Sequence, residues 1–422
     1  MEATTDAPVG ALLQSATARA PRRYDIDALR VIAFGLLILY HVGMSYVLDW
    51  GWHVKSAYQT EALQLPMLML NQWRMPLIFM ISGLAMSFVI GKYDGWQLAG
   101  RRSVRLLVPL VFGMLVVVPP QAYYQALTNG VIEPGYGDFL WRYFSFQGWP
   151  EGAFDGSDPG ITWNHLWYLP YLLTYTLLLI PLAAFLGGPG ARIVSAFRKL
   201  RGAWLILIPI LPLMLYGNFV FPYFPDITHD LINDGYAHVM YGTFFLYGFL
   251  MARDAGLWAE IARLRWVTLI LAVSAFASLL FLTEVLPDDT STLQDQALMV
   301  VIYLNRWSWL LLALGWGHHL LNRSFRWLPY ATEAVYPWYI LHQSIIVVVG
   351  YNLARFSLGA VVEPALVLAA TVGGCLLIHE FVIRRTGWLR PLFGVNAVAR
   401  SPVGRQEHAE MPALGARLGD VN

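Results

Sequence analysis

The chain has 422 residues, of which 57% are hydrophobic and only 13% are charged. Soluble proteins carry about 25% charged residues, so this composition excludes a soluble globular fold for most of the chain. The formal net charge is +1, which offers no bulk polarity for a nucleic-acid partner. The single cysteine, Cys375, cannot form a disulfide within the chain. We therefore predict an all-α, polytopic membrane protein whose main partner is the lipid bilayer.

The apolar residues fall in runs of about 18 to 25, the length that crosses a hydrocarbon core of roughly 30 Å. Membrane-spanning β-strands are excluded because these runs are too long and do not alternate. The polar segments 1–26 and 397–422 are predicted to be disordered tails around one membrane domain at 27–396, and no cleavable signal peptide is expected. About ten transmembrane helices are predicted, at 28–49, 64–90, 104–120, 165–187, 203–221, 236–251, 266–283, 296–317, 333–352 and 362–384.

The basic residues are distributed unevenly between the two sides of these helices. Most of the 28 Lys and Arg residues fall in the tails and in alternate loops on one side. The positive-inside rule places that side in the cytoplasm, so both termini are predicted to be cytoplasmic in a plasma (inner) membrane. The longest loop on the outer side, 121–164, is rich in glycine and acidic residues, and a loop of this length is usually functional or disordered.

The first predicted helix carries two ionisable residues, Arg30 and His41, on one face. Eleven residues of α-helix make three turns plus about 20° and rise about 16 Å, so His41 lies about halfway across the membrane. Ionisable groups at that depth are costly and mark functional sites by default, although an intramembrane histidine often only bonds a neighbouring helix. A buried imidazole is held neutral and keeps a lone pair. We predict that both residues belong to a catalytic site.

Arg102 and Arg105 open the third predicted helix. Residues three apart on a helix project together, and arginine suits bidentate contact with phosphate. Membrane anchoring alone would also favour arginine at this position. Together with Arg22, Arg23 and Arg30, this pair is predicted to bind a polyphosphate such as coenzyme A.

Arg74 in the second helix and Arg306 in the eighth lie too deep for surface anchoring to explain them. Either could pair with an intramembrane acid, or face a substrate carboxylate or a developing oxyanion. The ninth helix carries Glu333 at its inner end and His342 near the midplane, and a purely structural role for His342 is equally open. All four are candidate site residues.

Aromatic residues crowd the predicted outer surface. Most belong to the interfacial belt, and some, such as Trp167, could stack on a sugar ring. No HExxH, CxxC, GxGxxG or P-loop pattern occurs, so no metal site or nucleotide-binding fold is predicted. A GxSxG pattern is also missing, so a serine-hydrolase triad is not indicated.

Several motifs resemble the integral-membrane acyltransferase-3 family over about residues 24–396. The shared patterns are Arg-x10-His at 30–41, F-x-x-S-G at 79–83, R-x-x-R at 102–105, HLWYL at 165–169 and YPWYILHQ at 336–343. Within the family the chain is most similar to the periplasmic glucan succinyltransferase branch, through RMPLIFMISG at 74–83, HHLLN at 318–322 and HE...RPLFG at 379–394. Glu333 stands where that branch carries an amide, which puts the carry-over of its substrate in doubt.

The resemblance implies ten helices, an acyl-CoA donor used from the cytoplasm, and transfer to a hydroxyl of a carbohydrate or related acceptor at the outer side. The predicted function is therefore an O-acyltransferase with acetyl-CoA or succinyl-CoA as donor substrate and no permanently bound cofactor. His41 is expected to act as general base or to accept the acyl group, with Arg30 and Arg74 beside it in the catalytic site. The residues expected to bind the substrates are Arg102 and Arg105 for the donor, and Arg306, Glu333, His342 and Trp167.

Two alternatives come from other functional classes. In a transporter or exporter, His41, Arg74 and His342 would form a proton relay or substrate pathway. Many transporters are built from internal repeats, and the sequence shows none, which weakens this alternative. In a membrane scaffold these residues would carry out no chemistry. Consumption of a thioester by the purified protein separates the first interpretation from the other two.

Overall fold

The computed structural model describes residues 22–285 and 292–396. Within these ranges every regular element is helical, apart from one isolated bridge between Val47 and Thr60, which confirms the all-α fold. The predicted tails lie outside the described residues, except for residues 22–26. The first helix begins at Tyr24, three residues before the predicted domain boundary.

Each of the ten predicted transmembrane segments is helical. In the described part of the chain, seven helices are long and apolar enough to cross a membrane, or up to eight if α4, η2 and α5, which bend by 43°, count as one span. The two remaining predicted segments are α3 and α11, which do not meet this criterion; α11 has only 17 residues. The ten segments correspond to α2 (Tyr24–Met44), α3 (Gln64–Ser87), α4 (Gly95–Phe112), α7 (Tyr168–Gly187), α9 with α10 (Ala203–Leu207, Ile210–Phe219), α11 (Gly235–Met251), α13 (Arg265–Leu280), α14 (Thr292–Leu321), α15 (Leu328–Leu353) and α16 (Val362–Leu377).

Shorter helices connect these segments. The predicted loop 121–164 is partly helical and folds around the buried ring of Tyr143. The connecting α-helices are α5 (Pro119–Thr128), α6 (Tyr136–Phe144), α8 (Ala191–Arg198), α12 (Ala255–Arg263) and α17 (Leu389–Leu392). The π-helical turns are η2 (Gly113–Val117), η5 (Phe281–Val285) and η7 (Ile378–Ile383), and the 3-10 turns are η1 (Glu61–Leu63), η3 (Asn164–Trp167), η4 (Phe221–Tyr223) and η6 (Ala354–Phe356).

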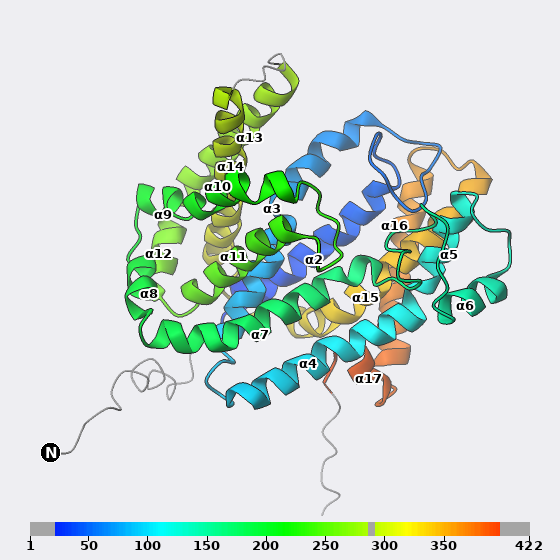
Figure 1. Cartoon of the computed structure of the whole chain (residues 1–422), viewed down its shortest axis with the longest axis horizontal. Coiled ribbons are helices and arrows are strands. Elements are labelled where there is room, and N and C mark those ends of the chain that lie inside the picture. The colour runs from blue at the N-terminus through cyan, green and yellow to red at the C-terminus, as the bar shows by residue number, and fades with distance from the viewer. Residues whose placement is uncertain (1–21, 286–291, 397–422) are drawn as a thin grey trace, which may run out of the picture.

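Helix α2 lies inside the bundle, packed against α3, α14, α15 and α16. Figure 1 shows α13 and α14 as a hairpin that extends beyond the other helices. Ile32 and Leu39, on the remaining face of α2, are 42% and 50% exposed. The ionisable face of α2 is therefore turned towards protein, as the cost of an ionisable group in lipid requires.

Helices α3 and α11 approach each other through glycines. A Cβ atom on Gly83 would lie 1.8 Å from the carbonyl oxygen of Phe245, and one on Gly248 would lie 1.9 Å from that of Met80. Both obstacles are backbone atoms, so no side-chain rearrangement could relieve them. The Ser82-Gly83 pair therefore permits the close helix contact that small residues allow in membranes.

The helix ends that carry most of the arginines meet at one end of the bundle, termed the basic end. There the buried carboxylate of Asp25 binds Arg23 at 2.6 Å and His318 at 2.8 Å, which joins the start of α2 to the end of α14. Arg384 binds Glu333 at 3.0 Å, which joins η7 to the start of α15. The opposite end, formed by segments 45–63 and 121–164, is termed the loop end.

Candidate active site

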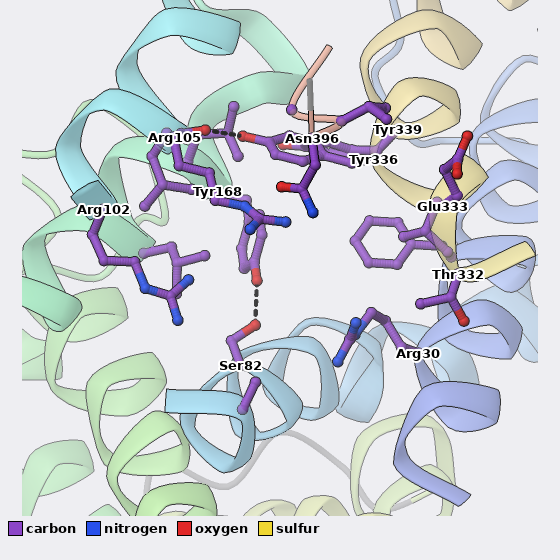
Figure 2. A pocket seen from close by; sticks show the side chains of 18 of the residues that line it. Arg30, Ser82, Arg102, Arg105, Tyr168, Thr332, Glu333, Tyr336, Tyr339 and Asn396 are labelled. Carbon is purple, nitrogen blue, oxygen red and sulfur yellow. Dashed lines mark hydrogen bonds between the residues drawn. The ribbon is translucent and has the colours of Figure 1, made fainter. Parts of the chain in front are cut away.

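A cavity of about 490 Å³, termed the basic cavity, lies at the basic end of the bundle. Its walls come from α2, α3, α4, α7 and α15 and from residues near the end of the described chain. Figure 2 shows the side chains of Arg30, Arg102 and Arg105 around the same space. Arg390 also lines the cavity, and Glu333 is the only acidic residue among the described residues of the lining. This excess of positive charge suits an anionic ligand.

The arginine pair of α4 is available for such a ligand. Within the part of the chain that the structure describes, neither Arg102 nor Arg105 forms an ion pair with a carboxylate, while Arg30 is 3.8 Å from Asp27. Pro109 has no N–H to bond the carbonyl of Arg105, and that carbonyl accepts a hydrogen bond from the Tyr336 hydroxyl at 3.4 Å. The proline thus ties the middle of α4 to α15 across the cavity wall.

Aromatic rings form the cavity wall on the side nearer the membrane interior. The rings of Phe34 and Tyr339 meet edge to face at 5.5 Å, and Tyr168 lies 6.0 Å from Tyr339. The Tyr168 hydroxyl is also 2.5 Å from the Ser82 hydroxyl (Figure 2). All of these residues line the basic cavity. We term Phe34, Tyr168 and Tyr339 the aromatic layer.

Two histidines lie beyond the aromatic layer. His41 is two helical turns from Phe34, and His342 is one turn from Tyr339. The His41 Nδ1 atom is 2.9 Å from His342 Nε2, and the two rings are nearly parallel, with centroids 5.1 Å apart. Neither residue lines the basic cavity. The donor residues and the histidines predicted from sequence are therefore neighbours on opposite sides of the aromatic layer.

The hydrogen bonds of this pair assign its tautomers. His342 Nδ1 is 2.8 Å from the carbonyl oxygen of Tyr339, and a carbonyl can only accept, so Nδ1 carries the proton. His342 Nε2 is then an acceptor, and His41 must donate to it from Nδ1. The remaining His41 nitrogen, Nε2, keeps its lone pair and contacts no hydrogen-bond partner among the described residues. This atom can accept a proton.

A polar network runs from Gln343 to the loop end. Gln343, next to His342, donates to His53 Nε2 at 2.8 Å and to Asn164 at 2.8 Å. His53 Nδ1 is 2.5 Å from the amide oxygen of Gln125, and the Gln125 amide nitrogen donates to Asp155 at 3.0 Å. The Asp155 carboxylate is 68% exposed, so the network reaches from the bundle interior to solvent at the loop end.

The network also holds segment 45–63 over His41. Ser56 in this segment donates to the buried carboxylate of Glu363 at 2.7 Å. The Trp52 ring then lies 5.3 Å from the His41 ring and 4.7 Å from the His53 ring. Sequence reasoning missed His53, Trp52 and Gln343. Trp52 and His53 follow the first predicted helix, and Gln343 lies within the ninth predicted helix, but nothing local linked them to His41.

A fourth histidine, His165, appeared in the sequence analysis only within the HLWYL motif. Its Nε2 atom donates to the carbonyl of Ile340 at 3.1 Å, and its Nδ1 atom is 3.3 Å from the Gln121 amide nitrogen. Its ring meets that of His342 at 87°, with centroids 5.3 Å apart. Because both ring nitrogens are engaged, His165 supports His342 without offering a free lone pair.

Arg74 lies near the histidines, and no carboxylate among the described residues forms an ion pair with it. Its guanidinium carbon is 3.5 Å from the Tyr40 ring centroid, and Tyr40 precedes His41. The Arg74 side chain is buried, and its Nε and Nη1 atoms have no hydrogen-bond partner in the described ranges. The positive charge of Arg74 is within electrostatic range of the His41 and His342 rings. These unpaired donors are a candidate oxyanion or carboxylate site.

Arg306, unlike Arg74, has hydrogen-bond partners for its guanidinium group. Pro76 in α3 leaves the carbonyl of Gln72 without its helical partner, and Arg306 Nε donates to that oxygen at 2.9 Å. Arg306 does not line the basic cavity. The structure therefore places Arg306 in the contact between α14 and α3, two residues along α3 from Arg74 and outside the basic cavity.

Trp167 is half-buried, and one face of its indole is covered. The ring of His229 stacks on it with centroids 4.0 Å apart, and Trp163 donates to the His229 carbonyl at 2.9 Å. Burial lowers the pKa of His229 to about 4, so the stacked imidazole is neutral. His229 has a positive φ of 61°, and its N–H donates to the buried Asp234. A sugar could reach Trp167 on this face only if His229 moved.

Glu333 lies at the rim of the basic cavity and is paired with Arg384 and, at 3.8 Å, with Arg390. Over residues 22–285 and 292–396, no group of three or more His, Cys, Asp or Glu is arranged to hold a metal ion.

The fold and the site together define a helical membrane protein with an arginine-lined cavity near a half-buried histidine, His41, that is hydrogen-bonded to His342. The chain belongs to the family described as Acyltransferase domain (Acyl_transf_3), whose model matches residues 23–380. Family membership confirms the resemblance to the acyltransferase-3 proteins, while the glucan succinyltransferase branch stays a prediction. Comparisons with curated proteins and with solved structures found no match.

Proposed function

We propose that this protein is an O-acyltransferase that moves an acetyl or succinyl group from cytoplasmic acyl-CoA to a hydroxyl of a carbohydrate or related acceptor outside the plasma membrane. The observation that carries the proposal is the arrangement of the basic cavity, the aromatic layer and the His41–His342 pair in series. In this order, the basic cavity would bind the phosphates of the donor, the thioester would pass the aromatic layer, and the base would lie beyond it. The arginine bias supports a cytoplasmic basic end and an outer loop end.

The donor binds with its phosphates in the basic cavity. Arg102 and Arg105 hold them through charge-assisted hydrogen bonds, each worth about 1.5–3 kcal/mol, and Arg30 contributes from α2. The pantetheine arm extends towards the aromatic layer, which must open for the thioester to reach His41. When the aromatic layer closes again, the reacting groups are held in position. Such positioning supplies a large share of the rate enhancement in group-transfer reactions.

The acceptor approaches His41 from the loop end, past Trp52. His41 Nε2 takes the proton of the acceptor hydroxyl while its oxygen forms a bond to the thioester carbonyl carbon. The carbon–sulfur bond then breaks, and the imidazolium returns its proton to the departing thiolate. His342 accepts from His41 Nδ1 throughout, which orients the ring and stabilises its positive charge. General-base assistance of this kind contributes about 10²- to 10⁴-fold.

Arg74 supplies the positive charge beside the reacting carbonyl. With an acetyl donor, its unpaired Nε and Nη1 donors stabilise the developing oxyanion. With a succinyl donor, they bind the free carboxylate. Glu333 borders the donor site, Trp167 borders the acceptor side, and Arg306 acts on substrate only through the α3–α14 contact.

The test is release of free CoA thiol by the purified protein in lipid nanodiscs, with acetyl-CoA or succinyl-CoA and a glucan acceptor. His41→Ala is expected to abolish acceptor-dependent release while the protein still binds acyl-CoA. Arg101→Ala is the matched control for the cavity, because Arg101 does not line it and stacks on Tyr93 instead. If the wild-type protein neither binds nor consumes any acyl-CoA, the proposal is wrong.

One observation favours a transporter as the second candidate. The polar network from Gln343 to the exposed Asp155 resembles a proton path, which membrane transporters build from such residues. A transporter would move an acceptor or acylated product in response to a proton gradient without releasing thiol. Gradient-driven uptake in proteoliposomes without acyl-CoA would support this second function.

A further inference from the structure

A second cavity, of about 240 Å³, lies between α2 and α15 and is termed the α2–α15 cavity. Gly35 and Ile38 line it from α2, and Ala331, Ala334 and Trp338 line it from α15. Among residues 22–285 and 292–396, no Asp, Glu, Lys or Arg lines it. His342 is the lining residue farthest along α15, so the cavity reaches the histidine pair that the basic cavity does not reach.

The two cavities share part of the aromatic layer. Phe34, Val335 and Tyr339 line both of them. A group that enters from the basic cavity past Phe34 and Tyr339 therefore arrives in an apolar space with His342 at its inner end. The two cavities are thus neighbours across a shared wall, and the α2–α15 cavity continues the donor path when Phe34 and Tyr339 move apart.

We propose that the α2–α15 cavity binds the aliphatic chain of the donor's acyl group, so that the enzyme accepts acyl-CoA thioesters with chains longer than acetyl. This inference rests on the proposed acyltransferase function. An apolar cavity of about 150 Å³ can hold a benzene molecule, and the larger α2–α15 cavity therefore holds a chain of about six carbons. A succinyl carboxylate in the same space would be buried without a partner, which is strongly unfavourable.

Gly35 keeps part of this space open. A Cβ atom added to Gly35 would meet no heavy atom within 4 Å, and its φ is not positive. The backbone of α2 therefore does not require glycine at this position, and glycine weakens a helix interior. Gly35 is exposed at the open side of the cavity, and a leucine side chain at this position would narrow the opening.

The experiment measures kcat/KM for acetyl-, butyryl- and hexanoyl-CoA by thiol release in nanodiscs. The wild-type value is expected to rise by about fourfold per methylene, the factor that corresponds to about 0.8 kcal/mol per buried CH₂. Gly35→Leu, from α2, and Ala331→Leu, from α15, should each reduce the hexanoyl-to-acetyl ratio at least tenfold. Gly373→Leu is the control, because Gly373 on α16 also has open space around it and the ratio should not change.

A photoreactive hexanoyl-CoA with a terminal diazirine locates the chain independently of turnover. Crosslinks are expected within 31–38 and 330–342, and excess hexanoyl-CoA should remove them. If the wild-type protein prefers acetyl-CoA and the leucine variants leave the ratio unchanged, the inference is refuted while the acyltransferase function stands. Labelling that hexanoyl-CoA does not displace would assign the cavity to a bilayer lipid. Failure to consume any donor would instead refute the proposed function itself.

Discussion

The tautomer assignment predicts a specific kinetic defect when His342 is replaced. In His342→Leu, the His41 Nδ1–H loses its acceptor, and the imidazolium that forms during transfer loses a charge-assisted hydrogen bond now 2.9 Å long. Hydrogen bonds to charged groups are worth about 1.5–3 kcal/mol, which corresponds to about a 10- to 150-fold lower kcat. The KM for acyl-CoA should change little, because the phosphates bind beyond the aromatic layer.

Steady-state thiol release with varied acyl-CoA measures kcat and KM separately. His342 is fully buried, so thermal unfolding of each variant in detergent must accompany the kinetics. His342→Gln offers an amide oxygen to His41 and should recover part of kcat, whereas His319→Ala, at an exposed histidine of α14, should match the wild type. A stable His342→Leu protein with unchanged kcat would refute the assignment of His41 Nε2 as the base.

The other predictions concern binding, acyl selectivity, packing and orientation. Arg102→Ala should raise the KM for acyl-CoA by about 10- to 150-fold through one lost charge-assisted bond, and Arg102→Lys should recover only part of this loss; an unchanged KM would make Arg102 an orientation anchor. Arg74→Met should impair succinyl transfer more than acetyl transfer if Arg74 binds the succinyl carboxylate, because that carboxylate would then be buried unpaired; equal losses would assign it to the oxyanion. Gly248→Val should lower the thermal unfolding temperature, since overpacking typically costs about 1–3 kcal/mol and the obstacle at 1.9 Å is backbone. In a Cys375→Ala background, a cysteine at Gly156 should react with an impermeant thiol reagent in intact cells; protection would reverse the proposed orientation.

The helices were predictable because their signals are local. Apolar length places a helix in the membrane whatever surrounds it, and all ten expected segments are helical. The count of strongly apolar helices is lower, at seven or eight, because an interior helix can exchange lipid contact for protein contact. The shared face of Arg30 and His41 also followed from helical geometry alone, as did the joint projection of Arg102 and Arg105.

Pairings between helices were decided only by tertiary packing. His41 and His342 are 301 residues apart, and hydropathy holds no information about which helix becomes the neighbour of α2. The same is true of the Phe34–Tyr339 contact and of the cavity between α2 and α15, which depends on the volume that two packed helices leave empty. Local sequence specified which residues are ionisable and which helix carries each of them. Packing decided that His41 found a hydrogen-bond acceptor in His342, while Arg74 stacks on Tyr40 and pairs with no carboxylate among the described residues.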